Sequence, residues 1–299
     1  MSLLRLIQRY KQFDFAGFVP VTALDDAGQL IRLGLTKDEV ARDLARLGPD
    51  VFLYDGGSLH LNPELTTYAA RTEAVDGLLL EASEQGILPP KTDYSHIGGD
   101  DWYSVGDRHK PLFEMRRFYV VYLGVRGYAS RLNAYHDGQM WVVKRGTGVH
   151  EYPGRYDTLV GAGQVIRRTI WEHLLVEAHE EAGLTPADCK NIQSTSMLHI
   201  FRRTSRGFLF DENIYLYDLD TGGTITPHIV NEWEVQKIEL WPFAKVLHAI
   251  HNTEEFRPEA ALCLIDFFIR HGVITPDNEP DYDALCFGLR SLLPTAIEP

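Results

Sequence analysis

The chain has 299 residues, a formal net charge of −13 and 44 % hydrophobic residues. Its length suggests about two domains at roughly 100–200 residues each, and its ordinary apolar fraction excludes a chain that is disordered throughout. The acidic balance argues against a nucleic-acid binder, which needs a basic surface, but a small anion can still bind at a local basic patch or through a metal ion. No stretch approaches the roughly 18 apolar residues of a membrane span, so no membrane partner is expected.

The cysteines and the N-terminus indicate a cytoplasmic protein. Cys189, Cys263 and Cys286 are odd in number and form no C-x-x-C pair. This pattern is typical of buried free thiols in a reducing compartment rather than of a disulfide framework. Residues 1–15 have no long apolar core and no cleavage site, so they predict an amphipathic helix rather than a targeting segment.

The first hundred residues predict mixed helix and strand. Residues 36–39 form a capping-box signature, which predicts a helix that runs to Gly48. The sequence Asp-Gly-Gly-Ser at 55–58 lies between two short apolar runs and predicts a hairpin. Asn62-Pro63 predicts the start of a long helix that ends near Gly86.

A domain boundary is predicted in the segment 88–111, which contains Pro89-Pro90, Gly98-Gly99 and Asp100-Asp101. We therefore expect a smaller α+β accessory domain at residues 1–110 and a second domain at 111–299. The aromatic and β-branched runs at 118–135 and 139–145 predict two strands joined at 136–138.

The rest of the chain alternates helices and strands. A helix is predicted from Thr169 to Ala182, where Gly183 ends it. Strands are expected at 196–201, 214–218 and 235–240, and helices at 242–250 and 258–271. A helix between strands on both sides favours an α/β sandwich with a mixed sheet.

The helix at 169–182 carries three carboxylates on one face. At about 100° per residue, Glu180 and Glu181 fall on either side of Glu177. These like charges repel each other, and two of them lie near the helix C-terminus, where the helix dipole disfavours negative charge. A divalent cation such as Mg²⁺ would compensate them, because it prefers carboxylate oxygens. A solvated acidic helix end is the alternative. The stripe expected to dock on the sheet consists of Ile170, Trp171, Leu174, Leu175, Ala178 and Ala182.

The run Glu-Ala-His-Glu-Glu-Ala-Gly-Leu at 177–184 resembles the end of the Nudix box, G-x5-E-x7-R-E-U-x-E-E-x-G-U. The flanks at 141–163 and 238–282 resemble the Nudix subfamily related to thiamine pyrophosphokinase, and the N-terminal part resembles its accessory domain. The resemblance covers residues 15–290.

This resemblance implies an α/β/α Nudix sandwich and a hydrolase acting on a diphosphate linked to an organic moiety. It implies that Glu177, Glu180 and Glu181 bind Mg²⁺ or Mn²⁺, with Glu180 and Glu181 in the catalytic set. Relatives of this subfamily remove a phosphate from damaged thiamine diphosphate, leaving the monophosphate. A nucleoside diphosphate derivative is the alternative substrate.

The box departs from the family pattern at three positions. Arg168 stands where the box has its first Glu, Val176 where it has Arg, and Ala162 where it has its opening Gly. In the family the Glu and the Arg help to brace the loop against the helix. Both partners are replaced together, which can be close to neutral, so we expect the carboxylates to survive on a rebuilt scaffold. A Nudix-fold binding or regulatory module with weakened catalysis is the alternative.

Further residues complete the predicted site. Lys144 and Arg145 end a strand and are expected to reach a phosphate. Glu234 matches an acidic position of the subfamily and is expected to bind metal or to act as general base, with Glu212 as a weaker candidate. Trp102 is a candidate to stack on a heteroaromatic ligand.

Three more residues are given structural roles. Asp157, in the stretch Pro153-Gly154-x-x-Asp157, is expected to fix its loop, and His173 and His179 are expected to be exposed helix residues. The expected partner is a small-molecule diphosphate, and a homodimer is the default oligomeric state.

Overall fold

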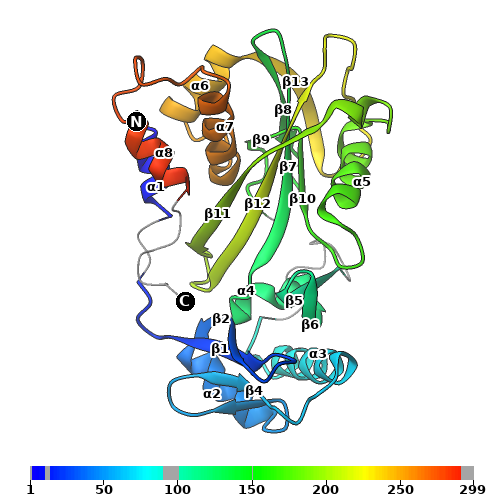
Figure 1. The fold of residues 1–299 in the computed structure, drawn as a ribbon, viewed down its shortest axis with the longest axis vertical. Coiled ribbons are helices and arrows are strands. Elements are labelled where there is room, and N and C mark those ends of the chain that lie inside the picture. The colour runs from blue at the N-terminus through cyan, green and yellow to red at the C-terminus, as the bar shows by residue number, and fades with distance from the viewer. Residues whose placement is uncertain (1, 11–13, 90–100, 150, 291–299) are drawn as a thin grey trace.

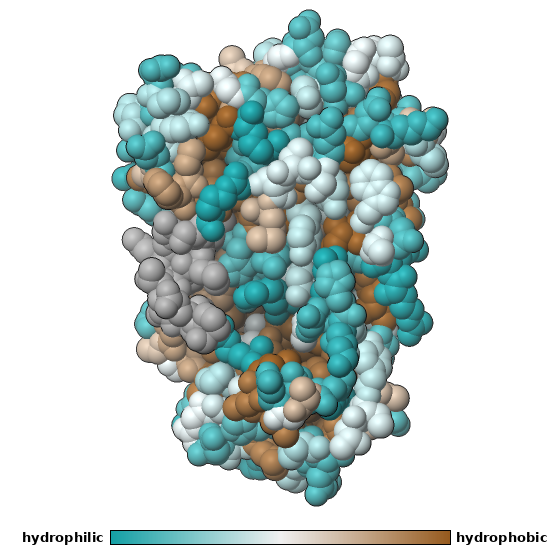
Figure 2. Space-filling model, viewed as in Figure 1, coloured by the Kyte–Doolittle hydropathy of each residue, from teal (hydrophilic) through white to brown (hydrophobic). Residues whose placement is uncertain are grey.

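The computed structural model describes residues 2–10, 14–89, 101–149 and 151–290. A seven-stranded sheet with helices on both faces forms the larger part, and a four-stranded sheet with two helices forms the smaller part (Figure 1). Pro90, Gly98-Gly99 and Asp100 of the predicted boundary lie outside the described residues. The exposed surface in this view is mostly hydrophilic (Figure 2).

The smaller sheet has the strand order β2-β1-β4-β3. Its strands are β1 (Phe18–Leu24), β2 (Leu30–Lys37), β3 (Phe52–Tyr54) and β4 (Leu59–Leu61). The helix α2 (Asp38–Leu47) packs on it, and α3 (Tyr68–Glu84) packs against α2. The hairpin predicted at 55–58 is confirmed by the antiparallel pair β3–β4.

Both helices predicted in this part form, and Gly48 caps the C-terminus of α2 as expected, but the residues predicted to begin the two helices are wrong. Thr36 belongs to β2, and its hydroxyl donates to the carbonyl of Tyr122 2.6 Å away instead of capping α2. The hydroxyl of Thr67 accepts from the N–H of Ala70, so α3 begins five residues after Pro63. The hydroxyl of Thr36 therefore makes a long-range hydrogen bond instead of a local N-cap. In α3, Thr67 provides the N-cap in place of the predicted Asn62-Pro63 start.

The segment that connects the two parts begins with a hairpin of β5 (Trp102–Asp107) and β6 (Lys110–Arg116). The predicted strand at 118–123 is wrong, because a short 3-10 turn, η2 (Arg117–Tyr119), and α4 (Val120–Leu123) occupy these residues. Gly124 ends α4 with a φ of 56°. The rings of Phe118, Tyr119 and Tyr122 contact one another in the core, so tertiary packing overrides their strand propensity.

Residues 103–125 share one hydrophobic cluster with residues 19–88. We call residues 14–89 and 101–125 the N-terminal segment. The domain boundary after residue 110 stays a prediction.

The larger sheet is mixed and has the order β11-β12-β7-β8-β13, with β10 paired to β7 and β9 to β8. Only β12 and β7 run parallel among these pairs of described strands. The predicted turn at 136–138 and the three predicted later strands are confirmed. The strands are β7 (Gly127–His136), β8 (Gln139–Arg145), β9 (Tyr156–Asp157), β10 (Val160–Gly163), β11 (Gln193–Arg203), β12 (Leu209–Asp220) and β13 (Val235–Pro242).

Helices cover both faces of this sheet, which confirms the predicted α/β/α sandwich (Figure 1). One face packs on α5 (Ile170–Ala182) and the short 3-10 helix η3 (Asp188–Asn191). The other face packs on α6 (Phe243–Asn252) and α7 (Pro258–Arg270), with α1 (Leu4–Gln8) and α8 (Tyr282–Arg290) beside them.

The cysteine prediction is confirmed in part. All three cysteines are free; Cys189 and Cys263 are buried, and Cys286 is half-buried. Within the described residues, no helix has the length and apolar character needed to cross a membrane.

Candidate active site

Helix α5 forms as the sequence predicts because both of its ends are capped. The hydroxyl of Thr169 accepts from the N–H of Glu172, and the Glu172 carboxylate accepts from the N–H of Thr169. Gly183 ends the helix in the left-handed conformation with a φ of 65°. The side chains that dock on the sheet are Ile170, Leu174, Ala178 and Ala182. Trp171 was predicted in this stripe, but it is exposed.

The acidic edge of α5 faces a cavity of about 940 Å³. Glu177, Glu180 and Glu181 all line this cavity, and Glu234 reaches it from the loop before β13. Arg145, at the end of β8, and Glu212, on β12, line it as well. The structure therefore brings together residues predicted from separate parts of the chain.

Four of the glutamates that line this cavity, those of the acidic edge and Glu234, interact electrostatically. Burial raises the pKa of Glu177 to about 7, with contributions from Glu180 and Glu234. Burial, Glu177 and Glu234 raise the pKa of Glu181 well above its usual range. Oε2 of Glu181 accepts a hydrogen bond from the N–H of Gly161 3.2 Å away. A divalent cation would relieve the repulsion that these shifts express.

The donor set therefore fits a hard cation, since it consists of carboxylate oxygens. In the described part of the chain, no three His, Cys, Asp or Glu side chains are already grouped around one point as metal ligands. The fit rests on the charge and the oxygen donors of the site rather than on a preformed cage.

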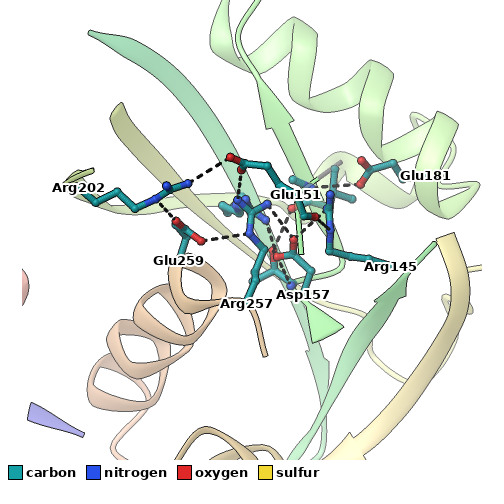
Figure 3. Close-up of polar contacts among 11 residues, drawn as sticks. Arg145, Glu151, Asp157, Glu181, Arg202, Arg257 and Glu259 are labelled. Carbon is teal, nitrogen blue, oxygen red and sulfur yellow. Dashed lines mark hydrogen bonds and ion pairs between the residues drawn. The ribbon is translucent and has the colours of Figure 1, made fainter. Parts of the chain in front are cut away.

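Behind the acidic edge, Asp157 lies among three guanidinium groups (Figure 3). Its carboxylate is 2.5 Å from Arg131, 3.3 Å from Arg257 and 3.4 Å from Arg145. Burial alone would raise the pKa of Asp157, but the three arginines hold it well below its usual range. This agrees with the prediction that Asp157 fixes its loop.

The network continues to the first turn of α7. The carboxylate of Glu259 lies between Arg202 and Arg257, at 2.8 Å and 3.3 Å (Figure 3). Glu151 accepts from Arg202 at 3.3 Å. Arg202, Arg257 and Glu259 were not predicted from the sequence, because they come from distant elements and show no motif spacing.

Gln164 and His173 hold the loop that the family braces with the box Glu and Arg. Nε2 of Gln164 donates to the carbonyl of Arg168 at 2.6 Å, and Nε2 of His173 lies 2.8 Å from the carbonyl oxygen of Gly163. The prediction of an exposed His173 is wrong, since only 3 % of the residue is exposed, whereas His179 is exposed as predicted.

Lys144 and Trp102 are not among the described residues that line the cavity, so the structure does not bring them together with the other predicted site residues, and their binding roles stay predictions. The ammonium of Lys144 lies 6.0 Å from the ring of Tyr156, and the guanidinium of Arg116 covers Trp102 at 4.9 Å. Successive side chains of a strand point to opposite faces. Arg145 and Tyr103, the next residues along their strands, line the cavity instead.

Part of the cavity lining comes from the N-terminal segment and consists mostly of apolar side chains; we call it the apolar wall. Phe118, Val120 and Val125 belong to it, together with Phe208, the residue before β12. Arg117 lies at the edge of this wall. The wall residues of the N-terminal segment fall at the beginning of the second predicted domain, 111–299, but no motif marked them as site residues, because their contacts with the rest of the cavity are tertiary.

The chain is similar to several known proteins. Residues 22–127 match a family model described as a domain of unknown function, DUF4743. The chloroplastic Nudix hydrolase 24 of Arabidopsis thaliana is 29 % identical over 286 residues, which covers 92 % of this chain and 73 % of that protein. The chloroplastic Nudix hydrolase 20 of the same plant is 29 % identical over 231 residues, covering 74 % of this chain and 59 % of that protein.

Two further similarities complete the comparison. The uncharacterized protein YJR142W of Saccharomyces cerevisiae is 31 % identical over 210 residues, covering 64 % of this chain and 60 % of that protein. A crystal structure of DR0079 from Deinococcus radiodurans has a TM-score of 0.45 at 17 % identity and covers 56 % of this chain and 98 % of that one. The chain spans about three fifths of two of its curated relatives and about three quarters of the third. The chain is thus similar to two curated proteins that are named Nudix hydrolases.

Proposed function

We propose that this protein is a divalent-metal-dependent hydrolase of a diphosphate linked to an organic moiety, with thiamine diphosphate or a damaged analogue as substrate. The observation that carries the proposal is the convergence of Glu177, Glu180, Glu181 and Glu234 on one cavity that also has an apolar wall. Such a cavity can accept a ligand with a charged end and an uncharged end. The likeness of the flanks to the thiamine pyrophosphokinase-related subfamily supports the finer assignment.

Glu177, Glu180 and Glu181 would hold Mg²⁺ or Mn²⁺, and Glu234 would act as a further ligand or as general base. The ion would neutralise the diphosphate and supply Lewis acidity at phosphorus. The N–H of Gly161 orients the Glu181 carboxylate, and Asp157 orients the guanidinium of Arg145 toward the cavity. Arg145 can donate to a phosphate oxygen from this position.

The test is incubation of the purified protein with oxythiamine diphosphate and Mg²⁺, followed by measurement of the monophosphate and inorganic phosphate. We expect turnover by the wild type and a loss of kcat of at least about 10²-fold in Glu181→Gln. Glu64→Gln, an exposed glutamate outside the cavity, is the matched control and should retain the wild-type rate. Equal turnover in wild type and Glu181→Gln would exclude the proposed role of the acidic edge.

A nucleoside diphosphate derivative is the second candidate substrate, because the apolar wall can hold a base as well as a thiamine ring. A panel of diphosphates under the same conditions separates the two. If no diphosphate is hydrolysed but Mn²⁺ binds in calorimetry, the protein is a binding module that has retained the site without efficient hydrolysis.

A further inference from the structure

Arg117 belongs to the N-terminal segment but lies against the end of β10, which leads to α5. A Cβ atom added at Gly163 would lie only 3.1 Å from Nη2 of Arg117, so the guanidinium packs on the backbone of this last residue of β10. The carbonyl oxygen of Gly163 contacts His173, whose Nε2 is 3.4 Å from the carboxylate of Glu177. Arg117 therefore lies at the edge of the acidic site, on the side of the apolar wall.

The electrostatic effects of Arg117 agree with this position. Burial raises the pKa of Glu177 and of Glu212 to about 7, and Arg117 acts on both in the opposite direction. The guanidinium is thus near enough to both carboxyls to influence their charge.

Arg117 differs from the other arginines deep in the cavity. The side chains of Arg131, Arg202 and Arg257 are at most 14 % exposed, and each has a carboxylate within 3.3 Å. The Arg117 side chain is 36 % exposed, and its carboxylate contact among the described residues is Asp101 at 3.6 Å. A guanidinium has five N–H donors, so Arg117 retains donors for a ligand in the cavity.

We propose that Arg117 binds the diphosphate group of the substrate, so that the N-terminal segment supplies a substrate-binding residue to the site. This inference rests on the proposed function. A diphosphate that approaches the acidic edge needs cationic partners, and a planar guanidinium binds phosphate oxygens through two parallel hydrogen bonds. Phe118, the next residue, lines the apolar wall, so Arg117 lies where the charged end of the substrate would meet its organic part.

The experiment measures binding of imidodiphosphate, a diphosphate analogue that resists hydrolysis, by calorimetry in the presence of Mg²⁺. We expect Arg117→Ala of the full-length protein to bind it roughly 10- to 100-fold more weakly than the wild type, because a charge-assisted hydrogen bond is lost. Arg117→Lys keeps the positive charge but not the paired N–H donors of the guanidinium, so its affinity should lie between those of the wild type and Arg117→Ala. With a hydrolysed substrate, KM should rise more than kcat falls.

Arg46→Ala is the matched control, since Arg46 is an exposed arginine of α2 far from the cavity lining, and it should bind like the wild type. Circular dichroism melting checks that each variant is folded. If the alanine variant does not fold, the affinity of Arg117→Lys for imidodiphosphate tests the inference. Wild-type affinity in a folded Arg117 variant, or no binding by the wild type, overturns the inference. Weaker binding by the variants without hydrolysis of any diphosphate would refute the hydrolase and leave the role of Arg117 standing.

Discussion

Nη1 of Arg131 lies 2.5 Å from Oδ1 of Asp157, and each side chain is only 5 % exposed. Asp157 also forms ion pairs with Arg145 and Arg257, so one carboxylate contacts three buried or half-buried guanidinium groups. These arginines come from β7, β8 and the start of α7. Asp157 therefore links the central strands β7 and β8 to the start of α7, behind the acidic edge.

Asp157→Asn should destabilise the protein strongly. It leaves three guanidinium groups around a neutral amide, and removal of one partner from a buried ion pair costs about 3–5 kcal/mol. Urea unfolding followed by tryptophan fluorescence measures the change. Asp43→Asn, which breaks a more exposed pair with Arg46 on α2, should cost less than about 1 kcal/mol. Similar losses in both variants would contradict the structural role of Asp157.

Glu177→Gln should stabilise the metal-free protein at alkaline pH. The folded-state pKa of Glu177 is about 7 against an ordinary value of 4.5, so its charged form is disfavoured in the fold. That unfavourable contribution is absent below about pH 4.5, grows up to about pH 7 and is complete above it. In the presence of a chelator we expect a gain of about 1–3 kcal/mol at pH 8 and none near pH 4.

The same unfolding series with Glu64→Gln provides the comparison for Glu177, because Glu64 is exposed. A gain that is equal at both pH values, or equal in both variants, would show that the pKa of Glu177 is not the cause.

Thr169→Ala should weaken the start of α5. The substitution removes the hydroxyl that accepts from Glu172 and breaks the reciprocal cap, at a cost of about 1 kcal/mol. Because α5 carries the acidic edge, kcat should fall together with thermal stability. Thr169→Ser retains the acceptor and should restore both; if it behaves like the alanine variant, the cap is not what matters at this position.

Restoring the family residues with Arg168→Glu and Val176→Arg should bring no gain in turnover. The loop already has its brace in the side chains of Gln164 and His173. Steady-state kinetics of the double variant against the wild type decides this. A large increase in kcat would mean that the site has decayed and that the present brace is inadequate.

Local rules predicted α5 well and failed at Thr36 and at residues 118–123. In α5 the cap, the apolar stripe and the terminal glycine all lie within fifteen residues and favour one structure. At Thr36 the hydroxyl found a partner in Tyr122, 86 residues away, which no local pattern could reveal. At residues 118–123 the strand propensity is high, but the contact between the rings of Phe118 and Tyr122 in the core favours helical turns.

The candidate site divides in the same way. Glu177, Glu180 and Glu181 could be found because helical periodicity places them together. The choice of Arg145 over Lys144 depended on which face of β8 meets the cavity, and that is fixed by the pairing of the whole sheet.

The sequence by itself determined the capped acidic helix and the alternation of helices and strands, because both follow from contacts between near neighbours in the chain. The tertiary structure decided the rest of the cavity: the arginines around Asp157, the apolar wall and the position of Arg117. These groups come from elements far apart in the sequence, and their meeting depends on how the sheet, α7 and the N-terminal segment pack together.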